Sequence, residues 1–247
     1  MDVGGIYDSN LNRYDHHQEG GAGKRENGIP YASFGLVWKH YGEQVCGNFD
    51  IFEKLDQVLV QPIDAGDNGL ELVDLRFAGI HPNTIVNFFE SFNPTWKIDD
   101  IERIEEFMYT VRLAKDYIKR IIKLYSDLVE AGEIVRSIYE KSSEKRLIVM
   151  DTFYPASGAI RDLREVLFTV YPRGDGNWSV KAVKEDDESF VYRKLMPKSW
   201  AGKRDAELEN ITGIKDVIFC HNHLYIATTR SKESAVKMAE MAINSRE

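Results

Sequence analysis

Apolar side chains recur at helical spacing through much of the first 141 residues. In the longest such pattern, from 98 to 141, apolar residues return every three or four positions, which predicts one long amphipathic helix. Gly132 is a candidate break within it. Shorter patterns predict a helix over 32–41 that stops at Gly42, and another over 49–61. The first 30 residues, dense in Gly, Asn, Asp and Ser, predict loops around short extended pieces.

The pattern changes near residue 147, where short runs of branched and aromatic residues predict strands. A turn-forming segment at 172–177 separates two of these runs and predicts a hairpin. A closing amphipathic helix is predicted over 231–244. The predicted strands are 146–150, 165–171, 178–183, 217–221 and 224–227.

These elements favour an α/β fold in three parts. We expect an N-terminal α/β domain over 1–97, a helical linker over 98–146 and a C-terminal α+β domain over 147–247. The composition, 43% apolar and 29% charged residues, is typical of globular proteins. Because no stretch approaches the ~20 apolar residues that span a bilayer, we expect no membrane association.

Charge and cysteine content narrow the classes of function. The formal net charge of −8 disfavours a broad surface that coats nucleic acid, but it allows an enzyme that grips a few phosphates. Cys46 and Cys220 form no CxxC pair, and we expect reduced thiols. With no apolar leader visible at Met1, we expect a cytoplasmic protein, or a nuclear or mitochondrial one in a eukaryote. The oligomeric state stays open, with a homodimer as one alternative.

A set of carboxylates and imidazoles in the first 67 residues is the strongest chemical signal. Such donors suit Mn²⁺, or alternatively Mg²⁺, Co²⁺ or Fe²⁺, and an ion held there would lower the pKa of a bound water and neutralise phosphate oxygens. Taken singly, each residue also fits a solvated surface charge or a turn residue that bonds its own backbone. The set comprises Asp2, Asp15, His16, His17, Asp64 and Asp67.

Order and spacing give these residues a family context. The Asp15-His16-His17 tripeptide and several further stretches resemble the melanocyte proliferating gene (Myg) family, a branch of the DHH-type phosphoesterases whose members have also been labelled metal-dependent protein hydrolases. The resemblance implies a Rossmann-like N-terminal domain of the DHH type. The matching stretches are 2–8, 13–18, 32–38, 63–69, 92–96, 200–205, 211–214 and 219–221.

The resemblance implies a site for two metal ions, usually Mn²⁺. Asp2 matches the aspartate that bridges the ions, and His16 matches a metal ligand. Asp64 matches the ligand of the fourth motif, with Asp67 as a rival assignment.

The implied reaction is 3′–5′ exonuclease activity on RNA or short oligonucleotides. His17 matches the histidine that faces the substrate phosphate. Asp15 matches a residue that orients the histidine pair without binding the metal itself.

One departure from the family pattern affects the metal count. The family begins with a segment like Thr-His-Asn-Gly-Thr-Phe-His-Cys-Asp-Glu, which supplies a histidine and an aspartate and has no counterpart here. We therefore expect a domain without its first strands, one retained ion on Asp2, His16 and Asp64, and impaired catalysis. The alternatives are a non-catalytic remnant that binds nucleotide or RNA, and a start site that leaves out the segment.

A glycine-rich loop follows the histidine pair. It differs from a phosphate-binding P-loop because Gln18 stands where that motif needs Gly and Arg25 where it needs Ser or Thr. Lys24 and Arg25 remain candidate contacts to substrate phosphates.

The resemblance suggests that the C-terminal domain closes over substrate. His221 and His223 alternate along a predicted strand and would point the same way, so a second metal site is the alternative role for them. Family members often carry Gly-Gly where this chain has Ala227-Thr228. The candidate phosphate contacts of this domain are Lys203, Arg204, His221 and Arg230.

Overall fold

The computed structural model describes residues 1–186 and 189–246. The chain forms two compact units, Met1–Ser126 and Asp127–Glu247, and helix α5 (Asp100–Lys141) contributes to both. The helix expected over 98–141 is thereby confirmed, and Gly132 does not break it. Mixed helix and sheet content confirms the α/β class, while the boundaries at residues 97 and 146 remain predictions.

The N-terminal unit begins with a small antiparallel hairpin. Strand β1 (Tyr7–Asp8) pairs with β2 (Arg13–Tyr14) around a short 3₁₀ turn, η1 (Ser9–Leu11). The Asp8 side chain accepts a hydrogen bond from the N–H of Asn10, which stabilises the turn. In the described part of this unit the hairpin is the whole sheet, so the Rossmann-like arrangement remains a prediction.

Helix α1 (Ser33–Cys46) continues past the residue expected to end it. The predicted stop at Gly42 was wrong because this glycine packs inside the unit: a Cβ there would lie 2.8 Å from ring atoms of Trp38 and Phe52. The helix ends instead at Gly47, whose φ of +67° is a conformation that glycine adopts without strain.

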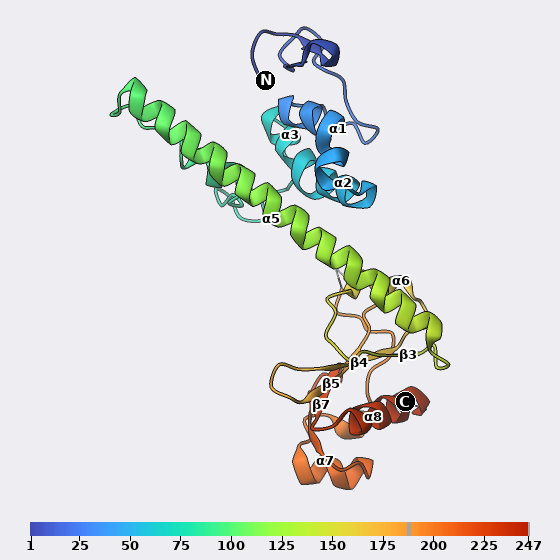
Figure 1. The fold of residues 1–247 in the computed structure, drawn as a ribbon. Helices are drawn as coiled ribbons and strands as arrows, with labels where there is room; N and C mark the ends of the chain where they lie inside the picture. Colours follow the sequence, from blue (N-terminus) through green and yellow to red (C-terminus); the bar gives the residue numbers. More distant parts are fainter. Residues whose placement is uncertain (187–188, 247) are drawn as a thin grey trace. The chain divides into compact units, whose positions relative to one another are not determined.

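The helix expected over 49–61 is longer than the apolar pattern indicated. It comprises α2 (Phe49–Leu55), a π turn labelled η2 (Asp56–Val60) and α3 (Gln61–Asp67), which has a proline in its first turn. These helices pack against α1 around fully buried side chains (Figure 1). The buried side chains include Leu36, Leu55, Val60 and Ala65. A further short helix that the apolar pattern did not reveal, α4 (Ile85–Glu90), follows in the same unit.

A five-stranded mixed sheet organises the C-terminal unit. Its strand order is β3-β4-β5-β7-β6, with β3 and β4 parallel and the other pairs antiparallel. The predicted strands and the hairpin at 172–177 are confirmed, although β4 begins three residues later than expected and the last strand two residues later. The strands are β3 (Leu147–Val149), β4 (Phe168–Pro172), β5 (Trp178–Ala182), β6 (Val217–Cys220) and β7 (Ile226–Thr229).

Helices cover both faces of this sheet (Figure 1). The predicted closing helix, α8 (Lys232–Asn244), packs on one face with α7 (Asp205–Thr212) beside it. Part of the other face packs against α6 (Ser157–Asp162) and the end of α5. The pattern did not reveal α6, α7 or the 3₁₀ turn η3 (Lys198–Trp200). At Gly132 an added Cβ would lie 3.3 Å from the Cβ of Ala159, so glycine lets α5 and α6 approach closely.

Candidate metal centre

The N-terminal segment is held beside the histidine pair by backbone hydrogen bonds. The N–H of Asp2 donates to the carbonyl of Tyr14 at 2.8 Å, and the N–H of Asp15 donates to the carbonyl of Ile6 at 3.3 Å. Chain termini are mobile unless such contacts hold them. Residue 2 is therefore fixed next to the end of β2, where the Asp-His-His tripeptide begins.

Four side chains converge at this point. Asp2, Asp15, His16 and His17 each present a ligand-type atom, and these atoms all lie within 4.8 Å of one another. Oδ1 of Asp2 lies 3.4 Å from Nδ1 of His16 and 3.7 Å from Nδ1 of His17. Carboxylate and imidazole donors at this density fit a divalent cation.

Asp15 is buried, and its hydrogen bonds occupy both carboxylate oxygens. Oδ1 accepts from the N–H of His17 at 3.0 Å and from its Nδ1 at 2.7 Å, while Oδ2 accepts from the N–H of Gly5 at 2.8 Å. The bonds from His17 and Gly5 hold the pKa of Asp15 well below its ordinary value, and the same contact raises the pKa of His17. Asp15 thus orients His17 and leaves its Nε2 toward solvent, since the His17 side chain is 63% exposed.

His16 is enclosed and links two carboxylates. Ser33 donates its hydroxyl hydrogen to Oδ1 of Asp2 at 2.9 Å, and its oxygen accepts from Nδ1 of His16 at 3.3 Å. The lone pair of His16 is then on Nε2, which lies 3.4 Å from Oδ2 of Asp67. Ser33 was missed as a site residue, although it lies in one of the stretches that match the family.

Asp64 lies outside this cluster, paired with Arg25. Its side chain is fully buried and accepts from Nη1 of Arg25 at 2.7 Å and from the N–H of Gly35 at 2.9 Å. Arg25 also binds Asp56 through Nη2 at 2.8 Å, and its guanidinium stacks on the ring of Tyr31.

These contacts perturb the pKa values of both partners. Burial raises the pKa of the Asp64 carboxyl, and the Arg25 guanidinium offsets part of that rise. Burial lowers the pKa of Arg25, but its hydrogen bonds to Asp56 and Asp64 more than compensate and raise it. Asp64 and Arg25 therefore form an ion pair with each other. Of the two aspartates considered as metal ligands, it is Asp67 that lies beside His16. Lys24, the neighbour of Arg25, is exposed.

The basic candidates of the C-terminal unit occupy different environments. Lys203 forms an ion pair with Glu207 one helical turn along, and Arg204 stacks on the ring of Phe219. The guanidinium of Arg230 lies 4.0 Å from a carboxylate oxygen of Asp205. The fourth candidate, His221, lines a cavity in the same unit, which these three residues do not line.

The expected strand placement of the second histidine pair was wrong. His221 and His223 lie in the turn between β6 and β7, where the N–H of Leu224 bonds to the carbonyl of His221. Their rings are still neighbours, with centroids 5.4 Å apart. Among the described residues, the cluster of metal-type side chains lies in the N-terminal unit and includes neither of these histidines.

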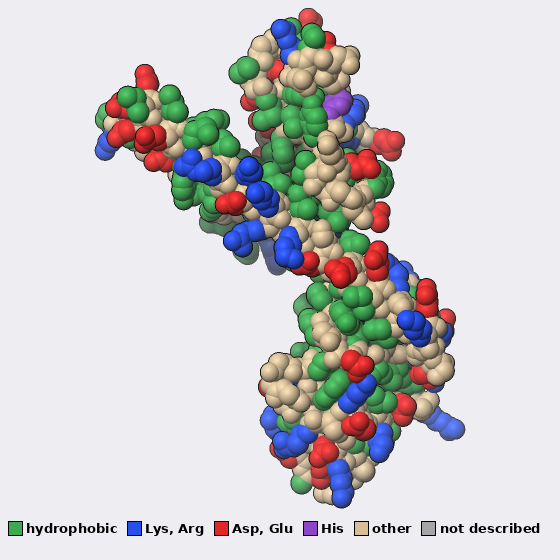
Figure 2. Space-filling view, viewed as in Figure 1, with side chains coloured by type: hydrophobic (Ala, Val, Ile, Leu, Met, Phe, Trp, Pro, Cys, Tyr) green, Lys and Arg blue, Asp and Glu red, His purple; other side chains and the backbone are tan. Residues whose placement is uncertain are grey.

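The surface carries no broad field of one sign on the face in view. Figure 2 shows basic and acidic side chains interspersed over both units. Ala227 and Thr228 are buried in β7 opposite Val180 and Ser179. Of the helices formed by the described residues, none has the length and apolar character needed to cross a membrane.

Comparison with known proteins shows that the chain is similar to MYG1 proteins over nearly its whole length. The MYG1_exonuc family model, described as an uncharacterised protein family (UPF0160), matches residues 1–243. A MYG1 protein of Schizosaccharomyces pombe is 28% identical over 274 residues, covering 99% of this chain and 83% of the relative. The MYG1 protein of Dictyostelium discoideum is 27% identical, covering 99% and 82%. The MYG1 exonuclease of Homo sapiens is 26% identical over 282 residues, covering 100% and 74%.

Proposed function

The chain belongs to the MYG1_exonuc family, and on that premise we propose that it is a metal-dependent phosphodiesterase that removes nucleotides from the 3′ end of RNA or short oligonucleotides. The convergence of Asp2, His16 and His17, with Asp67 beside His16, is the observation that carries this proposal. The human, rat, bovine and mouse relatives bear the name MYG1 exonuclease, which supports the reaction class.

Asp2, His16 and Asp67 would hold the ion, with Mn²⁺ as the proposed metal and Mg²⁺ or Co²⁺ as substitutes. Two donors on bonds of about 2.1 Å to one ion lie about 3.0–3.5 Å apart, and Nε2 of His16 lies 3.4 Å from Oδ2 of Asp67. The buried pairing of Asp64 with Arg25 favours Asp67 over Asp64 as the ligand. A bound ion would supply an activated water and neutralise phosphate charge.

The protein side chains supply orientation and phosphate contact. Ser33 holds Nδ1 of His16, so its Nε2, which lies beside Asp67, is the nitrogen left for the ion. Asp15 holds Nδ1 of His17, so its exposed Nε2 is placed to contact a phosphoryl oxygen. The exposed Lys24 is the basic residue of the loop after the histidine pair that remains available to a substrate phosphate, because Arg25 is buried in its ion pairs.

The direct test is cleavage of a 5′-labelled single-stranded RNA in the presence of Mn²⁺. A ladder that shortens from the 3′ end is expected for the wild-type chain, and EDTA should abolish it. His16→Ala should lower the rate at least ~100-fold because it removes an ion ligand. The matched control is His81→Ala, an exposed histidine outside the cluster, which should leave the rate unchanged. Equal rates for His16→Ala and wild type would refute the proposal.

The choice between the two aspartates has its own test. Binding of Mn²⁺, followed by the loss of the free-ion signal in electron paramagnetic resonance, should weaken at least ~10-fold in Asp67→Asn. Asp64→Asn should instead lower the stability of the N-terminal unit, because it removes the charge that faces Arg25. The reverse pattern would return the ligand role to Asp64.

A further inference from the structure

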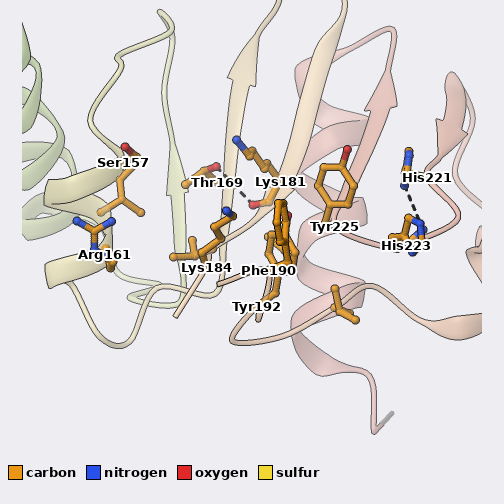
Figure 3. A pocket seen from close by; sticks show the side chains of 14 residues that line it. Ser157, Arg161, Thr169, Lys181, Lys184, Phe190, Tyr192, His221, His223 and Tyr225 are labelled. Carbon is orange, nitrogen blue, oxygen red and sulfur yellow. Dashed lines mark hydrogen bonds between the residues drawn. The ribbon is translucent and has the colours of Figure 1, made fainter. Parts of the chain in front are cut away.

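The C-terminal unit contains a cavity of about 780 Å³ that the metal centre does not explain. It lies where part of the sheet meets Lys184, Phe190, Tyr192 and Leu195 and the turn between β6 and β7 (Figure 3). This volume falls within the range of small-molecule sites in proteins. The side chains that matter for its chemistry are Lys181, Lys184, Phe190, Tyr192, His221 and Tyr225.

Flat aromatic rings form one part of the cavity lining. Tyr192 and Tyr225 stack with centroids 5.5 Å apart and planes inclined by 16°, and the His221 ring lies 4.7 Å from that of Tyr225. Phe190 is 85% exposed, which leaves a large apolar face in contact with water. Exposed aromatic faces of this kind stack well on a planar ligand.

Positive charge borders these rings. Lys181 is exposed on β5, and the ammonium of Lys184 lies 4.5 Å from the centre of the Phe190 ring. In Figure 3 both lysines extend from the strand end beside the aromatic rings. Within the described part of the chain, the residues that line the cavity include no Asp or Glu, although the chain carries 40 acidic residues against 32 basic ones. The cavity is therefore suited to an anion that also carries a planar ring.

We propose that this cavity binds a nucleobase and an adjoining phosphate of a single-stranded nucleic acid. The base stacks against Tyr225 and its neighbours, and Lys181 and Lys184 contact the phosphate. This combination of aromatic stacking and local positive charge is how proteins hold single strands without reading their sequence. The choice of nucleic acid as the ligand class rests on the proposed function, whereas the binding itself requires neither the metal ion nor cleavage.

The test measures binding by the full chain in EDTA, so that no strand is cut. The probe is a short single-stranded RNA that carries 2-aminopurine, whose fluorescence is quenched when the base stacks. Tyr225→Leu should weaken binding at least ~10-fold and remove the quenching. Lys184→Ala should weaken binding about threefold or more and lower the slope of log K against log salt by about 1.

Matched controls separate this site from general effects. Tyr109→Leu removes an exposed tyrosine from α5, and Lys237→Ala removes an exposed lysine from α8. Both should bind the probe as the wild type does. A strand with an abasic residue in place of each base should bind at least ~10-fold more weakly, whereas inorganic phosphate should compete only at high concentration.

The outcomes distinguish this inference from the proposed function. Quenching that depends on Tyr225 in a wild-type chain without Mn²⁺-dependent cleavage would support the cavity site and refute the nuclease. Cleavage by the wild type, together with unchanged probe binding by Tyr225→Leu and Lys184→Ala, would overturn the cavity site and leave the nuclease standing. Equal affinity for the abasic and normal strands would also overturn it.

Discussion

Replacing Gly35 by alanine tests how α1 and α3 are joined. Gly35 lies in the first turn of α1, and its N–H donates to Oδ1 of Asp64. A Cβ added there would lie 1.7 Å from Oδ2 and 2.6 Å from Cγ of Asp64. Such contacts are impossible, so the carboxylate must move away from both the Gly35 N–H and the guanidinium of Arg25.

The magnitude follows from two opposing effects. Alanine stabilises a helix interior by about 1 kcal/mol relative to glycine. Separating a buried ion pair so that one charge loses its partner costs about 3–5 kcal/mol. Both Asp64 and the Arg25 side chain qualify as buried, at 0% and 8% exposure. The net expectation for Gly35→Ala is a loss of about 2–4 kcal/mol in the N-terminal unit.

Because the chain has two units, one global unfolding free energy would be ambiguous. Amide hydrogen exchange followed by mass spectrometry gives opening free energies for peptides from α1 and α3 separately. The control is Gly66→Ala in α3, where an added Cβ meets nothing within 4 Å. That variant should change stability by between zero and about 1 kcal/mol in the stabilising direction. If α1 and α3 of Gly35→Ala exchange no faster than those of Gly66→Ala, the close packing of Gly35 on Asp64 is wrong.

Three further predictions concern ion pairs, thiols and metal. Arg25→Met should destabilise the N-terminal unit by about 3–5 kcal/mol because it leaves a buried carboxylate unpaired, whereas Lys24→Met, at an exposed neighbour, should have no measurable effect by the same exchange assay. Burial raises the pKa of Cys220 to about 12, so at pH 8 maleimide should modify Cys46 well before Cys220 in intact-mass measurements; equal rates without denaturant would contradict this burial. Mn²⁺ at about 100 times its Kd should stabilise the wild-type N-terminal unit by about 2.7 kcal/mol and should not stabilise His16→Ala, and an equal thermal shift in both would exclude His16 as a ligand.

Several elements could be predicted because their signal is local. The apolar spacing from 98 to 141 and the turn composition at 172–177 predicted α5 and the β4–β5 hairpin from neighbouring residues alone. Gly42 misled the prediction, since a glycine often ends a helix when nothing packs on it. Here Trp38 and Phe52 occupy the space that a side chain would need, and the helix continues.

The candidate site also combines features that the sequence reveals with features that depend on packing. By itself the sequence determined which donors are available, because Asp2, the Asp15-His16-His17 tripeptide and the two later aspartates can be recognised from their types and order. Only the tertiary structure decided their partners. Asp64 and Asp67 differ by three positions on α3, yet one is sealed against Arg25 and Gly35 while the other reaches His16. The burial and hydrogen bonds of these aspartates depend on residues as far away as Arg25, which is 39 positions from Asp64. Such contacts cannot be predicted from spacing along the chain, because they form only when the helices and loops pack together.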